Sequence, residues 1–164
     1  VANVIGGFTI LYTHPFHSGD YVEIAGQGGT VKEINMTYTV LSTPDNKLVS
    51  IPNSAVVAAQ IVNYSAMETR RVEVVVSASC DVPTQKVIDA MVLAGTVDNA
   101  LLDPAPAAVI TGYTEGAITY SLRVWTKTAD YWDVYFLVNQ RVKTIFDEQG
   151  IAMSYAHLNV HLHN

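Results

Sequence analysis

Five histidines are the residues whose type and spacing come closest to metal-binding chemistry in this chain. Three of them alternate with apolar residues near the end of the chain: His157, His161 and His163. Residues two apart on a strand share one face, but no Cys, Asp or Glu nearby completes a ligand set. The other two, His14 and His17, are separated by Pro15, which disrupts helical i,i+3 geometry. We therefore expect no metal site, and a polar outer face on a terminal strand.

No set of residues combines a nucleophile with a base in a recognisable order. Asp81 and Asp130 each lie where a helix is predicted to begin, and we interpret both as helix caps. Cys80 has no obvious base beside it to activate its thiol. The glycines of "GQGG" (26–29) lie between predicted strands and lack the Lys-Ser/Thr ending of a phosphate loop, so we interpret them as a hairpin turn. The sequence thus predicts no catalytic residue, no cofactor and no enzyme.

The composition of the chain limits its partners. It has 164 residues, a net charge of −6 and a pI near 5.2. An acidic balance argues against nucleic acid as a partner, because that needs a basic face. Charged residues make up 15% of the chain, against about 25% in typical soluble domains. Either much of the surface is buried against other chains, or part of the chain contacts lipid.

The first 13 residues carry no charge. Apolar side chains recur there at helical spacing: Val4, Phe8, Leu11 and Tyr12. Gly6 and Gly7 weaken an isolated helix, but paired glycines are tolerated where another helix or a pore axis comes close. Pro15 should end the helix. The segment is shorter than the roughly 20 apolar residues of a membrane span, so we expect it to be the tail of a longer membrane helix.

Two patterned regions follow. Residues 20–64 predict five short strands ("YVEIAG", "TVKEI", "YTVLST", "KLVSI", "QIVNYS"), a turn at 44–47 and one helix, "PNSAVVAA". From residue 70 the predicted order is β-α-β-β-α-β, the ferredoxin-like arrangement, with "LNVHLHN" as its last strand. Its strongest helix, within 128–150, has Gly150 where a C-terminal cap belongs. Six apolar positions of this helix keep the helical period: Val134, Tyr135, Val138, Val142, Ile145 and Phe146.

Three stretches in order resemble one family. "GGFTILYTHPFHSGDYVEI" is similar to the membrane-exit segment of small-conductance mechanosensitive (MscS) channels. "GTVKEINMTYTVLSTPDNKLVSIPNSAVVAAQIVNYS" resembles the continuation of that family, including its Ile-Pro-Asn motif, and "RRVEVVVSASCD" and "RVWTKTADYW" extend the resemblance. The match covers nearly the whole chain.

The resemblance implies an α+β chain in four parts. Residues 1–14 would form the cytoplasmic end of a pore-lining transmembrane helix and 15–64 an Sm-like β domain. Residues 65–154 would form a ferredoxin-like α/β domain, and 155–164 a C-terminal strand for an oligomeric β-barrel. The implied protein is a homoheptamer of the inner membrane, with these residues mainly on the cytoplasmic side. Its partners would be the lipid bilayer, further copies of itself, and permeating ions and small solutes.

The resemblance also assigns roles to three groups of residues. Pore-helix packing and gating would fall to Asn3, Gly6 and Gly7. The membrane-exit junction would comprise His14, Pro15, Phe16, His17, Gly19 and Asp20. The β-domain motif would comprise Gly29, Pro52, Asn53 and Asn63.

The implied function is a mechanosensitive channel that membrane tension opens, releasing ions and small solutes on hypo-osmotic shock. One departure from the family is that His14 and His17 stand where basic residues are usual, which predicts a tension threshold that shifts between roughly pH 6 and 7.5. Two alternatives stay open: a channel of the same architecture modulated by a ligand, and an Sm-like binding module that is not a channel. RNA binding by such a module is disfavoured by the acidic composition.

Overall fold

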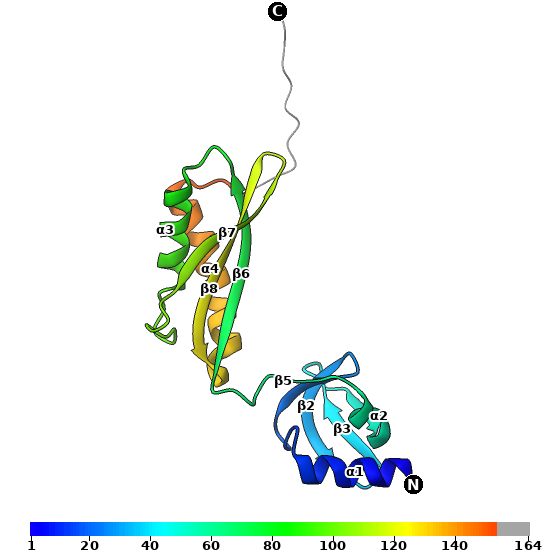
Figure 1. The fold of residues 1–164 in the computed structure, drawn as a ribbon. Helices are drawn as coiled ribbons and strands as arrows, with labels where there is room; N and C mark the ends of the chain where they lie inside the picture. The colour runs from blue at the N-terminus through cyan, green and yellow to red at the C-terminus, as the bar shows by residue number, and fades with distance from the viewer. Residues whose placement is uncertain (154–164) are drawn as a thin grey trace, which may run out of the picture. The chain divides into compact units, whose positions relative to one another are not determined.

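A computed structural model describes residues 1–153 of the chain. These residues divide into two compact units, the first spanning Val1–Glu68 and the second beginning at Thr69 (Figure 1). The predicted C-terminal strand at 155–164 and its three histidines lie outside the described residues. The predicted domain boundaries at residues 14 and 64 stay predictions.

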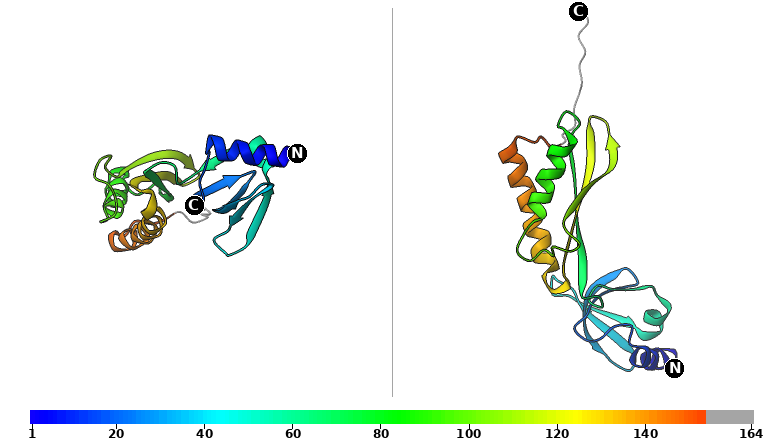
Figure 2. Two further views of the ribbon diagram at one scale, coloured as in Figure 1. Left: turned by 90° about the horizontal axis from the view of Figure 1, so that it is seen from below. Right: turned by 60° about the vertical axis from the view of Figure 1, so that its left-hand side comes forward.

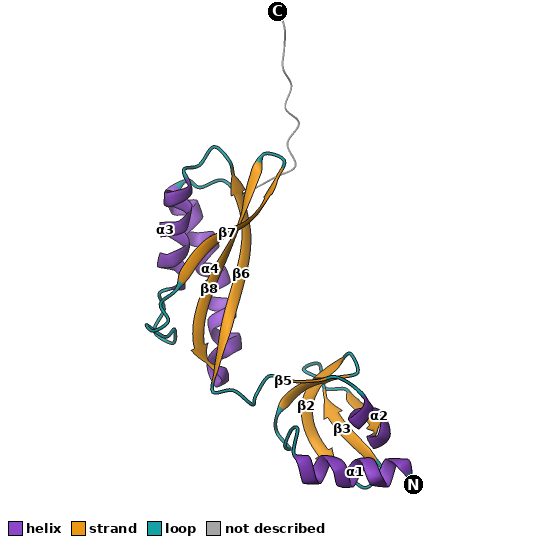
Figure 3. Cartoon of the chain, in the orientation of Figure 1, coloured by secondary structure: helices purple, strands orange, loops and turns teal. Residues whose placement is uncertain are grey.

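The first unit is an antiparallel five-stranded sheet with two helices (Figure 3). Its strands have the order β4-β3-β2-β1-β5. Its elements are α1 (Ala2–Thr13), β1 (Tyr21–Ile24), β2 (Gln27–Ile34), β3 (Tyr38–Ser42), β4 (Leu48–Pro52), α2 (Asn53–Ala58) and β5 (Ile61–Asn63). The prediction of five strands and one short helix within residues 20–64 is confirmed.

The turn between β1 and β2 differs from the prediction. It consists of Ala25 and Gly26, both with positive φ, and Ile24 pairs directly with Gln27. "GQGG" is therefore not the turn, because its last two glycines belong to β2. Gly29 is needed there for another reason: a Cβ at this position would lie 3.0 Å from the Ser42 carbonyl oxygen on β3. A close strand approach and a turn leave the same glycine signal in the sequence.

The core of the first unit joins α1 to the sheet. Its buried residues are Ile10, Phe16, Val22, Ile24, Val31, Leu41, Ile51 and Val56. Ile10 projects from α1, and Phe16 follows the end of this helix. Because these two side chains belong to the core of the sheet, α1 is an integral part of this unit. Within the described residues, no helix is both long enough and apolar enough to cross a membrane.

The second unit has a three-stranded antiparallel sheet in the order β6-β8-β7. Its elements are β6 (Thr69–Ser79), α3 (Thr84–Gly95), β7 (Ala107–Thr114), β8 (Ala117–Lys127), a 3-10 turn η1 (Thr128–Asp130) and α4 (Tyr131–Gln149). Strands β6 and β7 run parallel on either side of β8 and are connected through α3. Both helices cover the same face of this sheet (Figure 2). This is the split β-α-β arrangement that the sequence predicts.

After α4 the chain returns to β6. Gly150 ends α4 in the left-handed conformation, with φ 68°, as predicted for a C-terminal cap. Met153 then forms an antiparallel bridge with Ala78, and the Ser79 N–H donates to the Ala152 carbonyl at 3.0 Å. The described residues thus show the order β-α-β-β-α, and residues 152–153 lie beside the edge of β6 that β8 leaves free.

The predicted capping roles of Asp81 and Asp130 are not supported. Helix α3 begins at Thr84 with Pro83 at its N-cap, so Asp81 lies too early in the chain to cap it. The extended backbone of Pro83, at ψ 133°, delays the start of the helix. Asp130 does occupy the N-cap position of α4, but its side chain forms no capping hydrogen bond.

A charged cluster lies on strands β6 and β8. Glu73 accepts a hydrogen bond from the Ser121 hydroxyl at 2.7 Å, and this bond is the main reason that the pKa of the Glu73 carboxyl is lowered from its ordinary value. The positive charges of Arg71 and Arg123, whose nitrogens lie 3.6 and 3.7 Å from the carboxylate, lower this pKa further. The cluster therefore favours the ionised form of Glu73.

Glu73→Gln should make the second unit less sensitive to acid. Because the folded state lowers the pKa of Glu73, its carboxylate stabilises the fold above its unfolded pKa of about 4.3, and this contribution is lost as the pH falls through the folded pKa. Urea midpoints of wild type and variant should therefore differ more at pH 7 than at pH 3. Glu148→Gln is the control, since Glu148 forms no ion pair or hydrogen bond within residues 1–153. An equal gap at both pH values would contradict the prediction.

Candidate functional site

Helix α1 packs on the start of α2 through its two glycines. Both are buried. A Cβ at Gly6 would lie 2.8 Å from the backbone carbon and oxygen of Asn53. A Cβ at Gly7 would lie 2.9 Å from the Asn53 side-chain nitrogen and 3.0 Å from the Met36 carbonyl oxygen. The glycines therefore permit a backbone approach that a larger residue would block, and the approaching helix belongs to the same chain.

Asn53 is the fully buried polar residue beneath this approach. Its Nδ2 donates to the Asn35 carbonyl at 2.9 Å, and its Oδ1 accepts from the Thr39 hydroxyl at 2.8 Å. Its backbone N–H donates to the Thr37 carbonyl at 2.9 Å. Asn53 thus links the first turn of α2 to the β2–β3 connection through hydrogen bonds. Helix α1 packs on the surface that these two elements form.

Asn3 supplies the cap that α2 lacks. The N-cap residue of α2 is Pro52, which offers no side-chain capping bond. The Asn3 Oδ1 accepts instead from the Ser54 backbone N–H at 3.1 Å and from the Ser54 hydroxyl at 2.7 Å. We call this set, Asn3, Gly6, Gly7, Asn53 and Ser54, the glycine contact. It brings the three predicted pore-helix residues together with Asn53 of the predicted β-domain motif.

Asn3→Ala should lower the free energy of unfolding of the first unit by about 1 kcal/mol, the usual cost of removing an N-cap oxygen. Asn3→Asp keeps an oxygen acceptor at this position and should recover most of the loss. Amide hydrogen exchange of α2 in the two variants measures the difference. Equal protection of α2 in Asn3→Ala and wild type would show that the cap contributes nothing.

A second polar cluster lies where the chain leaves α1. His14 ends the helix in the left-handed conformation, with φ 49°. The Asn63 side-chain nitrogen on β5 donates to the Pro15 carbonyl and to the Asp20 carboxylate, each at 3.1 Å. The same carboxylate oxygen accepts from the His17 backbone N–H at 2.9 Å. We call residues 14–20 together with Asn63 the exit junction.

The exit junction is also anchored by its backbone and by one apolar side chain. Phe16 is 1% exposed and lies in the core of the sheet. Gly19 has φ 96°, a conformation that favours glycine, and its N–H donates to the Val31 carbonyl at 2.8 Å. The Val31 N–H in turn donates to the Asp20 carbonyl at 2.8 Å. All six predicted junction residues therefore lie in this one loop between α1 and β1.

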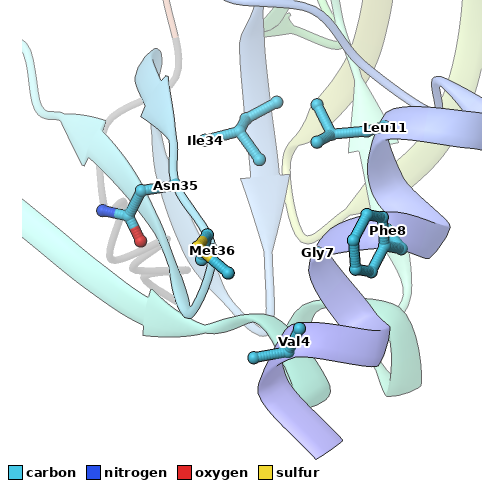
Figure 4. A pocket seen from close by; sticks show the side chains of 7 residues that line it. All are labelled: Val4, Gly7, Phe8, Leu11, Ile34, Asn35 and Met36. Atoms are coloured by element: carbon cyan, nitrogen blue, oxygen red, sulfur yellow. The ribbon is translucent and has the colours of Figure 1, made fainter. Parts of the chain in front are cut away.

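An apolar hollow of about 270 Å³ lies between α1 and the β2–β3 connection (Figure 4). It is lined by Val4, Gly7, Phe8, Leu11, Ile34, Asn35 and Met36. Figure 4 shows the side chains of Ile34 and Leu11 pointing toward one another across it. Apolar side chains are exposed on α1, at Ile5, Phe8, Leu11 and Tyr12, and at Val1 just before the helix. This helix therefore presents to its surroundings an apolar surface without charge.

Several residues that form hydrogen bonds at the glycine contact were not predicted from the sequence. Thr39, Ser54 and Asn35 each complete a hydrogen bond of the glycine contact, yet none belongs to the predicted site. A polar residue within an apolar strand, such as Thr39 in "YTVLS", was the available signal. Within residues 1–153, no three His, Cys, Asp or Glu side chains gather as metal ligands would.

Two family models match the chain. The β-domain of mechanosensitive ion channels matches residues 1–66, and the C-terminal domain of the mechanosensitive ion channel MscS matches residues 50–153. The chain therefore belongs to the MscS family of mechanosensitive ion channels, which is not a family of enzymes.

Individual relatives agree with this assignment. The small-conductance mechanosensitive channel of Edwardsiella ictaluri is 29% identical over 99% of this chain and 57% of its own length. The crystal structure of Helicobacter pylori MscS in its closed state has a TM-score of 0.88 at 25% identity, over 99% of this chain and 65% of that one. Arabidopsis thaliana MSL1 has the same fold, with a TM-score of 0.75 at 18% identity, over 94% and 58%. The chain thus spans 57% to 65% of the length of these relatives.

Proposed function

We propose that this chain is the pore-helix end and cytoplasmic part of an ion channel that membrane tension opens. The channel would release ions and small solutes when hypo-osmotic shock stretches the membrane. The observation that carries the proposal is the glycine contact: an uncharged helix with exposed apolar side chains, bound to a β unit of the MscS family. Helix α1 would be the last part of the pore-lining helix.

The two contacts of α1 suggest how tension would reach the β unit. Tension favours the state with the larger in-plane area, and only a difference between the two states can shift their equilibrium. The glycine contact holds the first half of α1, and the exit junction holds its end. A tilt of the pore helix would therefore strain both sets of hydrogen bonds, and their strength would help to set the tension needed for opening.

In the assembled protein, the exposed apolar surface of α1 would be buried. Exposed apolar surface of this kind is normally buried against lipid or another protein. We propose that the full protein is a homoheptamer in the inner membrane, and that α1 contacts neighbouring copies and the lipid bilayer. The described residues would then lie mainly on the cytoplasmic side.

Patch-clamp recording of the full-length protein tests the function. The protein is expressed in cells that lack their own mechanosensitive channels, and suction on an excised patch is raised in steps. Stepwise currents that increase with suction would support the proposal. Silence up to membrane rupture, with the protein detected in the patch membrane, would overturn it. Cells with empty vector provide the control, and survival of hypo-osmotic shock gives an independent measure of solute release.

A further inference from the structure

Two histidine rings lie against each other in the exit junction. The rings of His14 and His17 are stacked, with centroids 5.2 Å apart and planes at 9°. His14 is the C-cap residue that directly follows α1, and His17 lies three residues further along the loop that leads to β1. The stack therefore joins the end of α1 to the loop across the Pro15-Phe16 corner.

Asp20 faces one side of this stack. The Nδ1 of His17 lies 3.9 Å from the Asp20 Oδ2, the oxygen that also accepts from the His17 backbone N–H and from Asn63. The Asp20 side chain is 23% exposed, against 69% for His17, so the carboxylate is held in place while the ring is accessible to solvent. The carboxylate has room for attraction to a charged ring in addition to its two hydrogen bonds.

We propose that the His14–His17 stack is a proton-sensitive joint, closed when the rings are neutral and opened when both are charged. Imidazole side chains ordinarily gain their proton between about pH 7.5 and 6. With only one ring charged, no like charge faces it, and the Asp20 Oδ2 lies 3.9 Å from the His17 Nδ1. The second proton would place two like charges about 5 Å apart, which separates the rings and draws His17 toward Asp20.

The other charged groups near the exit junction do not offset the repulsion between the two charged rings. From β5, the residue facing the carboxylate is the uncharged Asn63. The carboxylate of Glu23 on β1 accepts from the Tyr64 hydroxyl at 3.1 Å. Lys32 on β2 is exposed and forms no ion pair within residues 1–153. Asp20 is thus the charged group that the structure places against the pair.

Hydrogen exchange tests the joint directly, whether or not the protein is a channel. The full-length protein is placed in nanodiscs of phosphatidylcholine alone, and exchange is compared at pH 8 and 5.5 after correction for intrinsic rates. The amides at the end of α1, including His14, which donates to the Ile10 carbonyl, should exchange about threefold faster at pH 5.5, as expected for screened repulsion at this distance. His14→Gln and His17→Gln should each abolish the change, and His161→Gln should keep it.

Two results would overturn the proposal. One is a pH effect that survives in His14→Gln. The other is an effect that is absent in phosphatidylcholine and present only with anionic lipid, since the partner of the histidines would then be a headgroup and not the neighbouring ring.

The consequence for gating rests on the proposed function and has its own measurement. Because charging the stack frees the end of α1, the suction for half-opening should be lower at cytoplasmic pH 5.5 than at pH 8, and this difference should vanish in His17→Gln. If no currents appear at any pH while exchange responds as expected, the channel function fails and the joint stands. Tension-gated currents with a threshold independent of pH would contradict the role of the joint in gating.

Discussion

Gly6→Ala is expected to loosen α1 from the first unit and to lower its free energy of unfolding by about 2 kcal/mol. The added methyl group would lie 2.8 Å from two backbone atoms of Asn53, which cannot turn aside as a flexible side chain can. Overpacking of this kind costs up to about 3 kcal/mol, and roughly 1 kcal/mol returns because alanine favours a helix more than glycine does.

Amide hydrogen exchange of α1 and α2 measures this loss. A change of 2 kcal/mol corresponds to about thirtyfold faster exchange for amides that open with the contact. Gly112→Ala is the matched control, since no atom beyond Gly112 and its two chain neighbours lies within 4 Å of a Cβ built at that position. It should change stability by no more than about 0.5 kcal/mol. If Gly6→Ala were as well protected as wild type, the close approach would not require glycine.

In a working channel the same variant should change gating. If the glycine contact resists the tilt of α1, Gly6→Ala should alter the suction needed for opening, while Gly112→Ala should leave it unchanged. A normal threshold together with faster exchange would separate the stability of the contact from any role in opening.

Structural features that neighbouring residues determine could be predicted from the sequence, whereas features that depend on contacts between distant parts of the chain could not. The ferredoxin-like order and the end of α4 at Gly150 follow from periodicity and one cap signal, because neighbouring residues determine both. The turn at Ala25–Gly26 was misplaced because a strand approach at Gly29 adds a second glycine signal nearby. The start of α3 was misplaced because Asp81 and Pro83 are both common near helix starts, and only the backbone geometry decides between them.

The contacts of the candidate site were even harder to predict from the sequence than the ends of the helices and strands. Resemblance to the family singled out Gly6, Gly7 and Asn53 separately, yet it did not state that they touch. Nearly 50 residues separate the glycines from Asn53, and no local pattern encodes that distance. The hydrogen bonds from Thr39 and Ser54 depend on register and on helix placement, so they emerge only after the sheet is built.

Asn53→Ala should be the most destabilising of the polar substitutions, lowering the free energy of unfolding of the first unit by about 3 kcal/mol. The residue is fully buried, and its loss leaves the Thr39 hydroxyl and the Asn35 carbonyl without their partners, besides opening a cavity. Asn99→Ala is a surface control for the same change of side chain, because Asn99 is exposed. This substitution should change the free energy of unfolding by no more than about 0.5 kcal/mol.

A double-mutant cycle assigns part of this loss to one hydrogen bond. Thr39→Val removes the hydroxyl that donates to the Asn53 Oδ1 and keeps the shape of the side chain. In the Asn53→Ala background the hydroxyl has already lost this partner, so Thr39→Val should cost about 1 kcal/mol less there than in wild type. Denaturant unfolding of the four proteins, followed by exchange of the β3 amides, gives the coupling energy. Strictly additive losses would mean that the hydrogen bond between Thr39 and Asn53 contributes no coupling energy, and that Asn53 stabilises the unit through its other contacts.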